Sequence, residues 1–226
     1  TLDGSQTHKL VLEGLFGTAE KVVSTKELID KNTLAKLKIK CIVLKHPTKK
    51  ERMDYVEEMD YIVSRESRNK FILDLCKNIS GNTLCLFQLV EKHGKILHDG
   101  MKGGENVYFV YGGTDTEQRE KIRGMVEGHT KSTTIASYGT FSTGINIRNI
   151  NNIVLASPSK SKIRVLQSIG RGLRTSSTKD SILIFDIADD ISYGERRNFT
   201  LNHFFERINI YNEEQFNYEI SKVKIK

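Results

Sequence analysis

The chain has 226 residues, of which 38% are hydrophobic and 28% are charged, and its formal net charge is +7. This composition can build one large domain and argues against an intrinsically disordered chain. No apolar run approaches the roughly 20 residues of a membrane-spanning helix, and no signal-peptide pattern opens the sequence. Cys41, Cys76 and Cys85 lack the paired spacing of zinc ligands, and His93 and His98 lack the i, i+4 spacing of a helical metal pair. We therefore expect neither a disulfide framework nor a metal site.

Along the chain, residues 1–60 combine two strand-like runs, 21–25 and 39–46, with a short predicted helix at 24–30. Beyond them, short runs rich in β-branched and aromatic residues alternate with helical patterns. The predicted strands are 82–89, 106–112, 133–139, 151–157 and 181–187, and the predicted helices are 65–77, 91–101, 115–126 and one beginning at Ser161. Each strand is nearly continuously apolar, as expected of strands buried on both faces. The alternation predicts an α/β domain in which helices cover both faces of a parallel sheet.

The C-terminal tail, residues 195–220, has a long helical pattern whose core face is Leu201, Phe204, Phe205 and Ile208. Another face of the same helix carries, at i, i+4 and i+8, His203, Arg207 and Tyr211. Such a row could contact DNA or the other half of a larger protein, but we favour a solvated surface face.

One long stretch of the chain lacks acidic residues. From Gly128 to Lys179 there is no Asp or Glu, but there are eight Lys or Arg residues. A solvated basic surface would normally intersperse acidic residues among the basic ones. The stretch is therefore expected to bind anions, and the phosphates of a nucleic acid or of a nucleotide are the natural candidates.

The arginine-rich segment QSIGRGLR, residues 167–174, lies near the end of this stretch. Extended back to residue 161, it predicts an amphipathic helix, because at about 100° per residue its polar and apolar residues fall on opposite sides. The polar stripe contains Arg164, Gln167, Arg171 and Arg174, and the apolar side contains Val165, Leu166, Ile169 and Leu173. Two glycines here each disfavour a helix by roughly 1 kcal/mol relative to alanine. We therefore expect a close approach to the backbone at this point, or the end of the helix.

The sequence contains no complete phosphate-binding loop. The best match, GTFSTGIN at 139–146, has Ile145 and Asn146 where the lysine and the hydroxyl residue of a P-loop belong. The acidic run DIADD at 186–190 ends a predicted strand, but without a P-loop its carboxylates have no nucleotide to serve. We therefore expect no complete ATPase site in this chain.

Two segments, 133–157 (TTIASYGTFSTGINIRNINNIVLAS) and 167–174, resemble motifs V and VI of superfamily 2 helicases in their order and spacing. Three further segments show the same resemblance. TLDGSQ at 1–6 resembles the end of motif III, and NTLCLF at 82–87 resembles motif IV. Residues 15–17 together with 26–39 resemble the stretch that joins the motor domains of repair and restriction helicases. The resemblance covers nearly the whole chain. Asn146 departs from it, because many members have Asp there and an amide carries no charge.

The resemblance implies the second RecA-like domain of an ATP-dependent DNA helicase or translocase, similar to bacteriophage members that act on branched DNA in recombination and repair. ATP and Mg²⁺ would be held mainly by the first motor domain, and an arginine finger of this chain would complete the site. The implied catalytic residues are Arg174 as the finger, Arg171 and Gln167, and the implied ATP-binding residues are Gly144, Asn146 and Gly170. The expected DNA-contacting residues are Ser137, Thr140, Ser142, Thr143 and Arg164.

The same resemblance divides the chain into three parts: the end of the first motor domain with the interdomain segment (1–20), the second RecA-like domain (21–192) and a C-terminal helical extension (193–226). The expected partners are single-stranded and branched DNA and the first motor domain of the same protein. A monomer in the cytoplasm of a bacterial host is expected. Two alternatives stay open: a non-catalytic nucleic-acid-binding module with this fold, and the motor part of a restriction-type nuclease.

Overall fold

The structure is a computed structural model, and it describes residues 6–18, 23–31, 33–47, 53–143, 147–159, 161, 169–170, 173, 181–192, 194 and 196–226. The strands in these residues are β1 (Lys36–Lys45), β2 (Asn82–Phe87), β3 (Val107–Val110), β4 (Ser132–Ser137), β5 (Asn152–Leu155), β6 (Ser181–Asp190) and β7 (Tyr218–Lys224). The helices are α1 (Gln6–Phe16), α2 (Thr25–Asp30), α3 (Tyr55–Ser64), α4 (Glu66–Asn78), α5 (Lys95–Gly100), α6 (Thr116–Gly128), α7 (Tyr138–Thr143) and α9 (Phe199–Glu213), and a π-helical turn, η1, spans Val90–Gly94.

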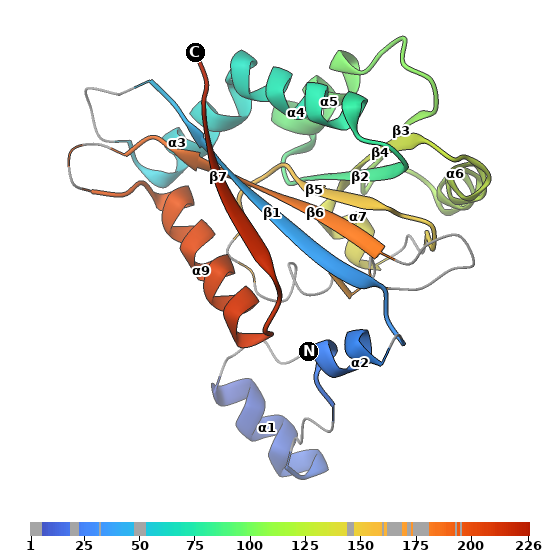
Figure 1. Cartoon of the computed structure of the whole chain (residues 1–226), viewed down its shortest axis with the longest axis vertical. Coiled ribbons are helices and arrows are strands. Elements are labelled where there is room, and N and C mark those ends of the chain that lie inside the picture. Colours follow the sequence, from blue (N-terminus) through green and yellow to red (C-terminus); the bar gives the residue numbers. More distant parts are fainter. Residues whose placement is uncertain are drawn as a thin grey trace.

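These strands form one sheet of seven in the described part of the chain, in the order β3-β4-β2-β5-β6-β1-β7 (Figure 1). Every neighbouring pair is parallel. The central strands β2, β4 and β5 are buried along their whole length, although four of the six residues of β4 carry hydroxyl groups. The predicted α/β class with a parallel sheet is confirmed.

Apolar side chains fill both sides of the sheet, because consecutive residues of a strand point to opposite faces. On one side, Leu86, Ile153 and Ile184 pack in a cluster with residues of α6, α7 and α9. On the other side, their neighbours Cys85, Val154 and Phe185 pack with residues of α4 and α5. The sheet is therefore sandwiched between two layers of helices, as predicted.

Part of the predicted arginine-bearing helix is described, and it is buried on its apolar side. Ile169 and Leu173 belong to the core cluster beneath α6 and α9. Leu173 N–H donates to Ile169 O at 2.9 Å, which is the bond of a helical turn. The carbonyl of Leu173 in turn accepts from Ala35 N–H at 3.0 Å, immediately before β1. This segment is therefore held against the sheet at both its side chains and its backbone.

Side-chain caps explain where two of the helices begin. Asp54 Oδ1 accepts from the backbone N–H groups of Val56 and Glu57 at 2.8 and 2.9 Å, and Glu57 Oε2 accepts from Asp54 N–H at 2.8 Å. This reciprocal capping box starts α3, a helix that the sequence reading did not predict. Asp115 caps α6 in a simpler way, by accepting from Gln118 N–H at 2.7 Å.

One strand prediction is wrong, and several predicted strands, among them 82–89, 106–112 and 151–157, extend beyond the observed strands. The strand predicted at 21–25 is wrong where the structure describes it, because Ser24 and Glu27 form a capping box that starts α2 at Thr25. The strand predicted at 133–139 is too long, because β4 ends at Ser137 and α7 begins at the next residue. In both places a serine hydroxyl at the boundary accepts a hydrogen bond from a backbone N–H of the following helix, which favours the start of a helix over the continuation of a strand.

The C-terminal tail is only partly helical. Helix α9 ends at Glu213, Gln215 adopts a φ of 56°, and the following residues form β7, which pairs in parallel with β1. Residues 196–226 therefore add a helix and an edge strand to the sheet domain. Phe205, predicted to face the core, is 37% exposed, whereas the other predicted core residues, Leu201, Phe204 and Ile208, are buried.

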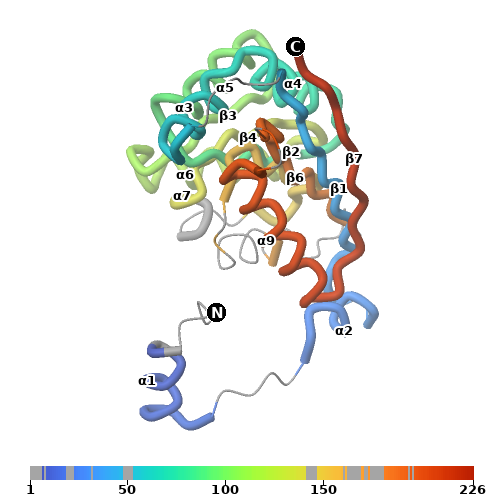
Figure 2. The backbone as a smooth tube through the Cα atoms, turned by 90° about the vertical axis from the view of Figure 1, so that its left-hand side faces the viewer, coloured from blue at the N-terminus to red at the C-terminus, as the bar shows by residue number. Residues whose placement is uncertain are grey.

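Helix α1 stands apart from the sheet in both views (Figure 1, Figure 2). Its apolar residues Leu10, Leu15 and Phe16 are largely exposed. None of the helices in the described part of the chain combines the length and the apolar run that crossing a bilayer requires.

Candidate functional site

Polar side chains gather at the edge of the sheet where the parallel strands have their carboxyl ends. Loops at this edge carry the functional groups of open α/β sheets. The described polar residues at or beyond these strand ends include His46, Gln88, His93, Ser137, Thr140, Ser157, Ser159 and Asp189. Two of the predicted site residues, Ser137 and Thr140, are among them.

Ser137 and Thr140, which the sequence predicts to contact DNA, contact each other. Their hydroxyl oxygens lie 2.8 Å apart, and Thr140 N–H donates to Ser137 Oγ at 3.4 Å. Ser137 is 8% exposed and Thr140 is 4% exposed, so this pair shapes the first turn of α7. Ser142 and Thr143 lie further along α7, and their side chains are outside the described residues. A contact of these four residues with DNA stays a prediction.

The arginine-bearing segment is described only around Gly170. Outside the described residues lie the predicted site residues Gly144, Asn146, Arg164, Gln167, Arg171 and Arg174. Gly170 is exposed, and a Cβ added to it would meet no described atom within 4 Å. The described neighbours therefore leave room for a group to approach the backbone here, and the roles of the six other residues stay predictions.

Arg68 of α4 forms a buried ion pair with Asp189 of β6. Its Nε and Nη2 donate to Asp189 Oδ1 and Oδ2 at 2.8 and 2.9 Å, the two-pronged geometry of strong Arg–carboxylate pairs. Nη2 also donates to Ala156 O at 2.7 Å, and His46 Nε2 lies 2.9 Å from Asp189 Oδ1. Burial alone would raise the pKa of Asp189, but Arg68 and His46 outweigh it and lower the pKa to about 2. Asp189 therefore stays ionised, and its charge is balanced within the chain.

On the opposite side of the sheet, Arg207 of α9 forms a second buried ion pair, with Asp186 of β6. Arg207 Nη2 donates to Asp186 Oδ1 at 2.6 Å, and Tyr211 Oη donates to Asp186 Oδ2 at 2.8 Å. Arg207 Nη1 also donates to Ser159 O at 3.0 Å. The predicted solvated face is therefore wrong for Arg207 and Tyr211, because Asp186 supplies a buried partner that helical spacing cannot reveal. Burial raises the pKa of Tyr211 well above its usual value.

Metal-ligand chemistry was tested against the same residues. Asp186 and Asp189 each accept from a buried arginine, so these two carboxylates of the DIADD run do not fit a magnesium site. Within the described ranges, no group of three or more His, Cys, Asp or Glu side chains could hold a metal ion. The three cysteines are free and buried.

His93 lies in the π-helical turn and is fully buried. Its Nε2 lies 3.4 Å from Arg68 Nη1, and its Nδ1 lies 2.9 Å from Ser157 Oγ. A guanidinium can only donate, so Nε2 accepts and the proton of the neutral ring sits on Nδ1. Burial, and then the neighbouring Arg68, lower the pKa of His93 to about 3. His93 is therefore neutral at pH 7 and donates from Nδ1 to Ser157.

This histidine should make the stability of the chain depend on pH. Below its ordinary pKa of 6.5, the unfolded state binds a proton that the folded state does not bind until about pH 3. Stability therefore falls as the pH falls through this window, and His93 should account for a loss of about 2 kcal/mol between pH 7 and pH 5. Urea unfolding at both pH values, for the unsubstituted chain and for His93→Gln, measures the difference. Equal pH dependence in the two proteins would contradict the assignment.

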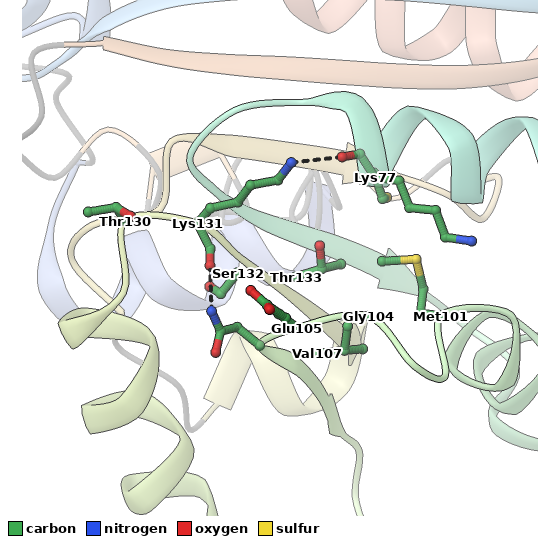
Figure 3. A pocket seen from close by; sticks show the side chains of 11 residues that line it. Lys77, Met101, Gly104, Glu105, Val107, Thr130, Lys131, Ser132 and Thr133 are labelled. Atoms are coloured by element: carbon green, nitrogen blue, oxygen red, sulfur yellow. Dashed lines mark hydrogen bonds between the residues drawn. The ribbon is translucent and has the colours of Figure 1, made fainter.

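A cavity of about 430 Å³ opens at the other edge of the sheet (Figure 3). It lies at the amino ends of β3 and β4, and its lining includes Met101, Val107, Lys131 and Thr133. Lys131 Nζ donates to Lys77 O at 2.8 Å across the mouth of this space, at the end of α4 (Figure 3). Because Ser137 and Thr140 lie at the carboxyl edge, the cavity is not part of the candidate site.

Comparison with known proteins identifies the family. Residues 67–176 match the family model described as helicase conserved C-terminal domain. The chain is 35% identical over 230 residues to the ATP-dependent DNA helicase UvsW of Enterobacteria phage T4. This alignment covers 94% of this chain and 46% of that protein. The crystal structure of T4 UvsW matches this structure with a TM-score of 0.71, over 84% of this chain and 42% of that chain.

Two solved structures of low identity share the fold. The C-terminal domain of the DEAD-box protein Dbp5 matches with a TM-score of 0.56 at 14% identity, over 86% of this chain and 92% of that chain. The ATP-dependent Type ISP restriction-modification enzyme LlaBIII, bound to DNA, matches with a TM-score of 0.63 at 11% identity, over 94% of this chain and 17% of that chain. The chain spans less than half the length of UvsW. The family match, the 35% identity to a helicase and the parallel sheet together show that the chain carries a helicase C-terminal domain with the RecA-like fold of superfamily 2.

Proposed function

We propose that the chain is the C-terminal half of the motor of an ATP-dependent DNA helicase or translocase that acts on branched DNA in recombination and repair. The observation that carries this proposal is the 35% identity to an ATP-dependent DNA helicase over 94% of the chain. A restriction-type motor is supported by likeness of fold alone. A non-catalytic binding module is the less favoured alternative, because the 35%-identical relative is named as an ATP-dependent helicase.

On the ATP side, the proposal gives Arg174 the role of arginine finger. Hydrolysis develops charge on the γ-phosphoryl oxygens, and a planar guanidinium held on a packed helix stabilises that charge. Arg171 would contact or orient the same phosphate, and Gln167 would hydrogen-bond in the same network. The burial of Ile169 and Leu173 supports this arrangement, because both belong to the apolar side of the predicted amphipathic helix.

ATP and Mg²⁺ would be held mainly by the first motor domain. When bound, ATP supplies the phosphoanhydride whose hydrolysis drives the motor. The residues of this chain proposed to lie against the nucleotide are Gly144, Asn146 and Gly170, and the open space at Gly170 supports this placement. The ion-paired Asp186 and Asp189 are unsuited to metal binding, which agrees with a metal held by the other domain.

On the DNA side, the proposed contacts come from α7 and the acid-free stretch, namely Ser137, Thr140, Ser142, Thr143 and Arg164. The hydrogen bond between the buried hydroxyls of Ser137 and Thr140 favours an indirect role for this pair, in which it holds α7 while exposed groups touch phosphate. The excess of basic residues between Gly128 and Lys179 supports binding to phosphates without selection of a base sequence.

We further propose that residues 1–20 are the end of the first motor domain and the joining segment. Residues 21–192 would then form the second RecA-like domain, and 193–226 an extension that completes the sheet. The exposed Leu10, Leu15 and Phe16 of α1 support this division, because contiguous apolar surface typically marks a contact with another surface. The partner would be the first motor domain of the same polypeptide, and the protein would act as a monomer.

Binding of single-stranded DNA by the intact protein should be electrostatic and indifferent to sequence. The logarithm of the affinity should fall linearly with the logarithm of salt concentration, with a slope of about −0.7 for each neutralised phosphate. Arg164→Ala should make this slope shallower by about 0.7, whereas Arg123→Ala should leave it unchanged, because Arg123 is already ion-paired within α6. Anisotropy titrations with oligonucleotides of two unrelated sequences measure both. A salt-independent affinity, or tight binding of one sequence only, contradicts the proposal.

A further inference from the structure

Ser157, just beyond the carboxyl end of β5, joins three segments that meet at the candidate site. Its Oγ accepts from Gln88 N–H at 3.1 Å and lies 2.9 Å from Nδ1 of His93. Its carbonyl accepts from Tyr138 Oη at 3.0 Å. The loop after β2 and the start of α7 are therefore both bonded to one buried serine, which lies between β2 and β6 in the sheet order.

The hydrogen-bond roles around Ser157 are set by the chemistry of its partners. Arg68 donates toward Nε2 of His93, so the ring must donate from Nδ1 to Ser157 Oγ. The backbone N–H of Gln88 also donates to Oγ. One serine oxygen thus satisfies two donors from the turn that follows β2, and neither donor has another acceptor among the hydrogen bonds of the described residues. Removing this oxygen leaves the buried ring N–H of His93 and the part-buried N–H of Gln88 unpaired.

The backbone on both sides of Ser157 is held by the two buried ion pairs. Arg68 donates to Ala156 O at 2.7 Å from one face of the sheet, and Arg207 donates to Ser159 O at 3.0 Å from the other face. The chain then continues into the segment that carries Ile169 and Leu173. The backbone of residues 156–159, which precedes the arginine-bearing segment, is therefore held in place on both faces of the sheet.

We propose that Ser157 and His93 are positioning residues that link the loop after β2 to the segment leading into the predicted arginine stripe, so that nucleic acid bound at the carboxyl edge sets the position of the arginines at ATP. This inference rests on the proposed motor function. Neither side chain touches DNA or ATP, since both are buried. They act through the placement of the loop and of residues 156–159.

The test compares Ser157→Ala with Ser132→Ala in the intact protein. Both serines are 2% exposed, and Ser132 Oγ donates to Asn82 Oδ1 at 2.7 Å at the opposite, amino edge of the same sheet. The control therefore removes the same atom at the same burial, away from the site. We expect Ser157→Ala to lower DNA-stimulated ATP turnover about tenfold, the effect of leaving buried donors unpaired, while basal turnover changes less than about twofold. Ser132→Ala should leave both the basal and the DNA-stimulated turnover unchanged, although it should lower the thermal unfolding midpoint about as much as Ser157→Ala does.

A second pair of variants tests the role of the imidazole. The amide nitrogen of Asn reaches about as far as Nδ1 of a histidine, and that of Gln reaches about as far as Nε2. His93→Asn should therefore retain most of the DNA stimulation, and His93→Gln should lose it. Three outcomes would each overturn this inference and leave the proposed function standing. They are an equal loss of DNA stimulation in His93→Asn and His93→Gln, unchanged stimulation in Ser157→Ala, and an equal loss of stimulation in Ser157→Ala and Ser132→Ala. An unsubstituted protein without DNA-stimulated turnover overturns the proposed function, and this inference with it.

Discussion

Replacement of Arg174 by alanine in the intact protein is expected to lower ATP turnover about 10³-fold, within the range of an arginine finger. The finger acts mainly on charge that develops in the transition state, so the affinities for nucleotide and DNA should be nearly unchanged. Arg174→Lys should restore little activity, because an ammonium lacks the planar, multiply donating geometry of a guanidinium. Steady-state turnover with saturating single-stranded DNA, beside nucleotide-binding titrations, measures these effects.

The matched control for Arg174 is Arg123→Ala. Arg123 is a half-buried arginine of α6 that pairs with Glu120 and Glu127 on the same helix, so its loss makes the same chemical change at a residue with no proposed role in the site. Turnover of this control should equal that of the unsubstituted protein. Near-normal turnover of Arg174→Ala would remove the finger assignment, whatever the control shows.

The second large effect concerns stability. Arg207→Ala should lower the free energy of unfolding by about 3 to 5 kcal/mol, because it leaves the buried Asp186 without its counter-charge. For a chain of this length, that corresponds to a fall of roughly 6 to 20 °C in the unfolding midpoint. Differential scanning calorimetry of this chain and of the variant measures the change.

Two further variants separate the buried charge from lost packing. Arg207→Met keeps most of the side-chain volume but not the charge, so it should be destabilised nearly as much as the alanine variant. Adding Asp186→Leu to Arg207→Met should recover part of the loss, because no buried carboxylate is then left unpaired. Loss of the half-buried Arg123, whose ion pairs lie within α6, should shift the midpoint far less. An Arg207→Ala variant as stable as Arg123→Ala would show that the ion pair is unimportant.

The central sheet could be predicted from the sequence because its strands are buried on both faces. Asn82–Phe87 contains four consecutive apolar residues and Asn152–Leu155 contains three, and such short apolar runs indicate buried strands. The edge strand β7 could not be found in this way. Most of its residues are exposed, and its sequence continues directly from a strongly helical pattern that ends at Glu213. Exposed edge strands are stabilised by pairing with a neighbour, here β1, which a local pattern does not show.

The buried ion pairs were beyond prediction for a related reason. Arg68 and Asp189 are 121 positions apart, and Arg207 and Asp186 are brought together only when α9 packs on the sheet. Helical spacing places Arg207 and Tyr211 on one face but does not show which element that face meets. Charged residues are usually exposed, so the solvated face was the reasonable expectation and was wrong here.

The site was predicted from motif order and from the gap in acidic residues. The structure confirms the parallel sheet, and it shows Ile169 and Leu173 buried as their place on the apolar side of the predicted helix requires. It also shows that Ser137 and Thr140 bond to each other, which a motif cannot reveal because both hydroxyls could equally face solvent. The contacts of Arg171 and Arg174 depend on a nucleotide and a second domain, so they stay predictions.

The most direct test of the half-motor account is the ATP turnover of this chain alone, measured beside the intact protein with saturating single-stranded DNA. The account predicts DNA-stimulated turnover by the intact protein and none by this chain, because its arginines meet no P-loop lysine or metal-bound phosphate in the same polypeptide. Residual turnover that persists in Arg171→Ala and Arg174→Ala variants of the chain would be contamination. Turnover by the isolated chain that disappears with either substitution would reveal a complete catalytic site within these 226 residues and contradict the account.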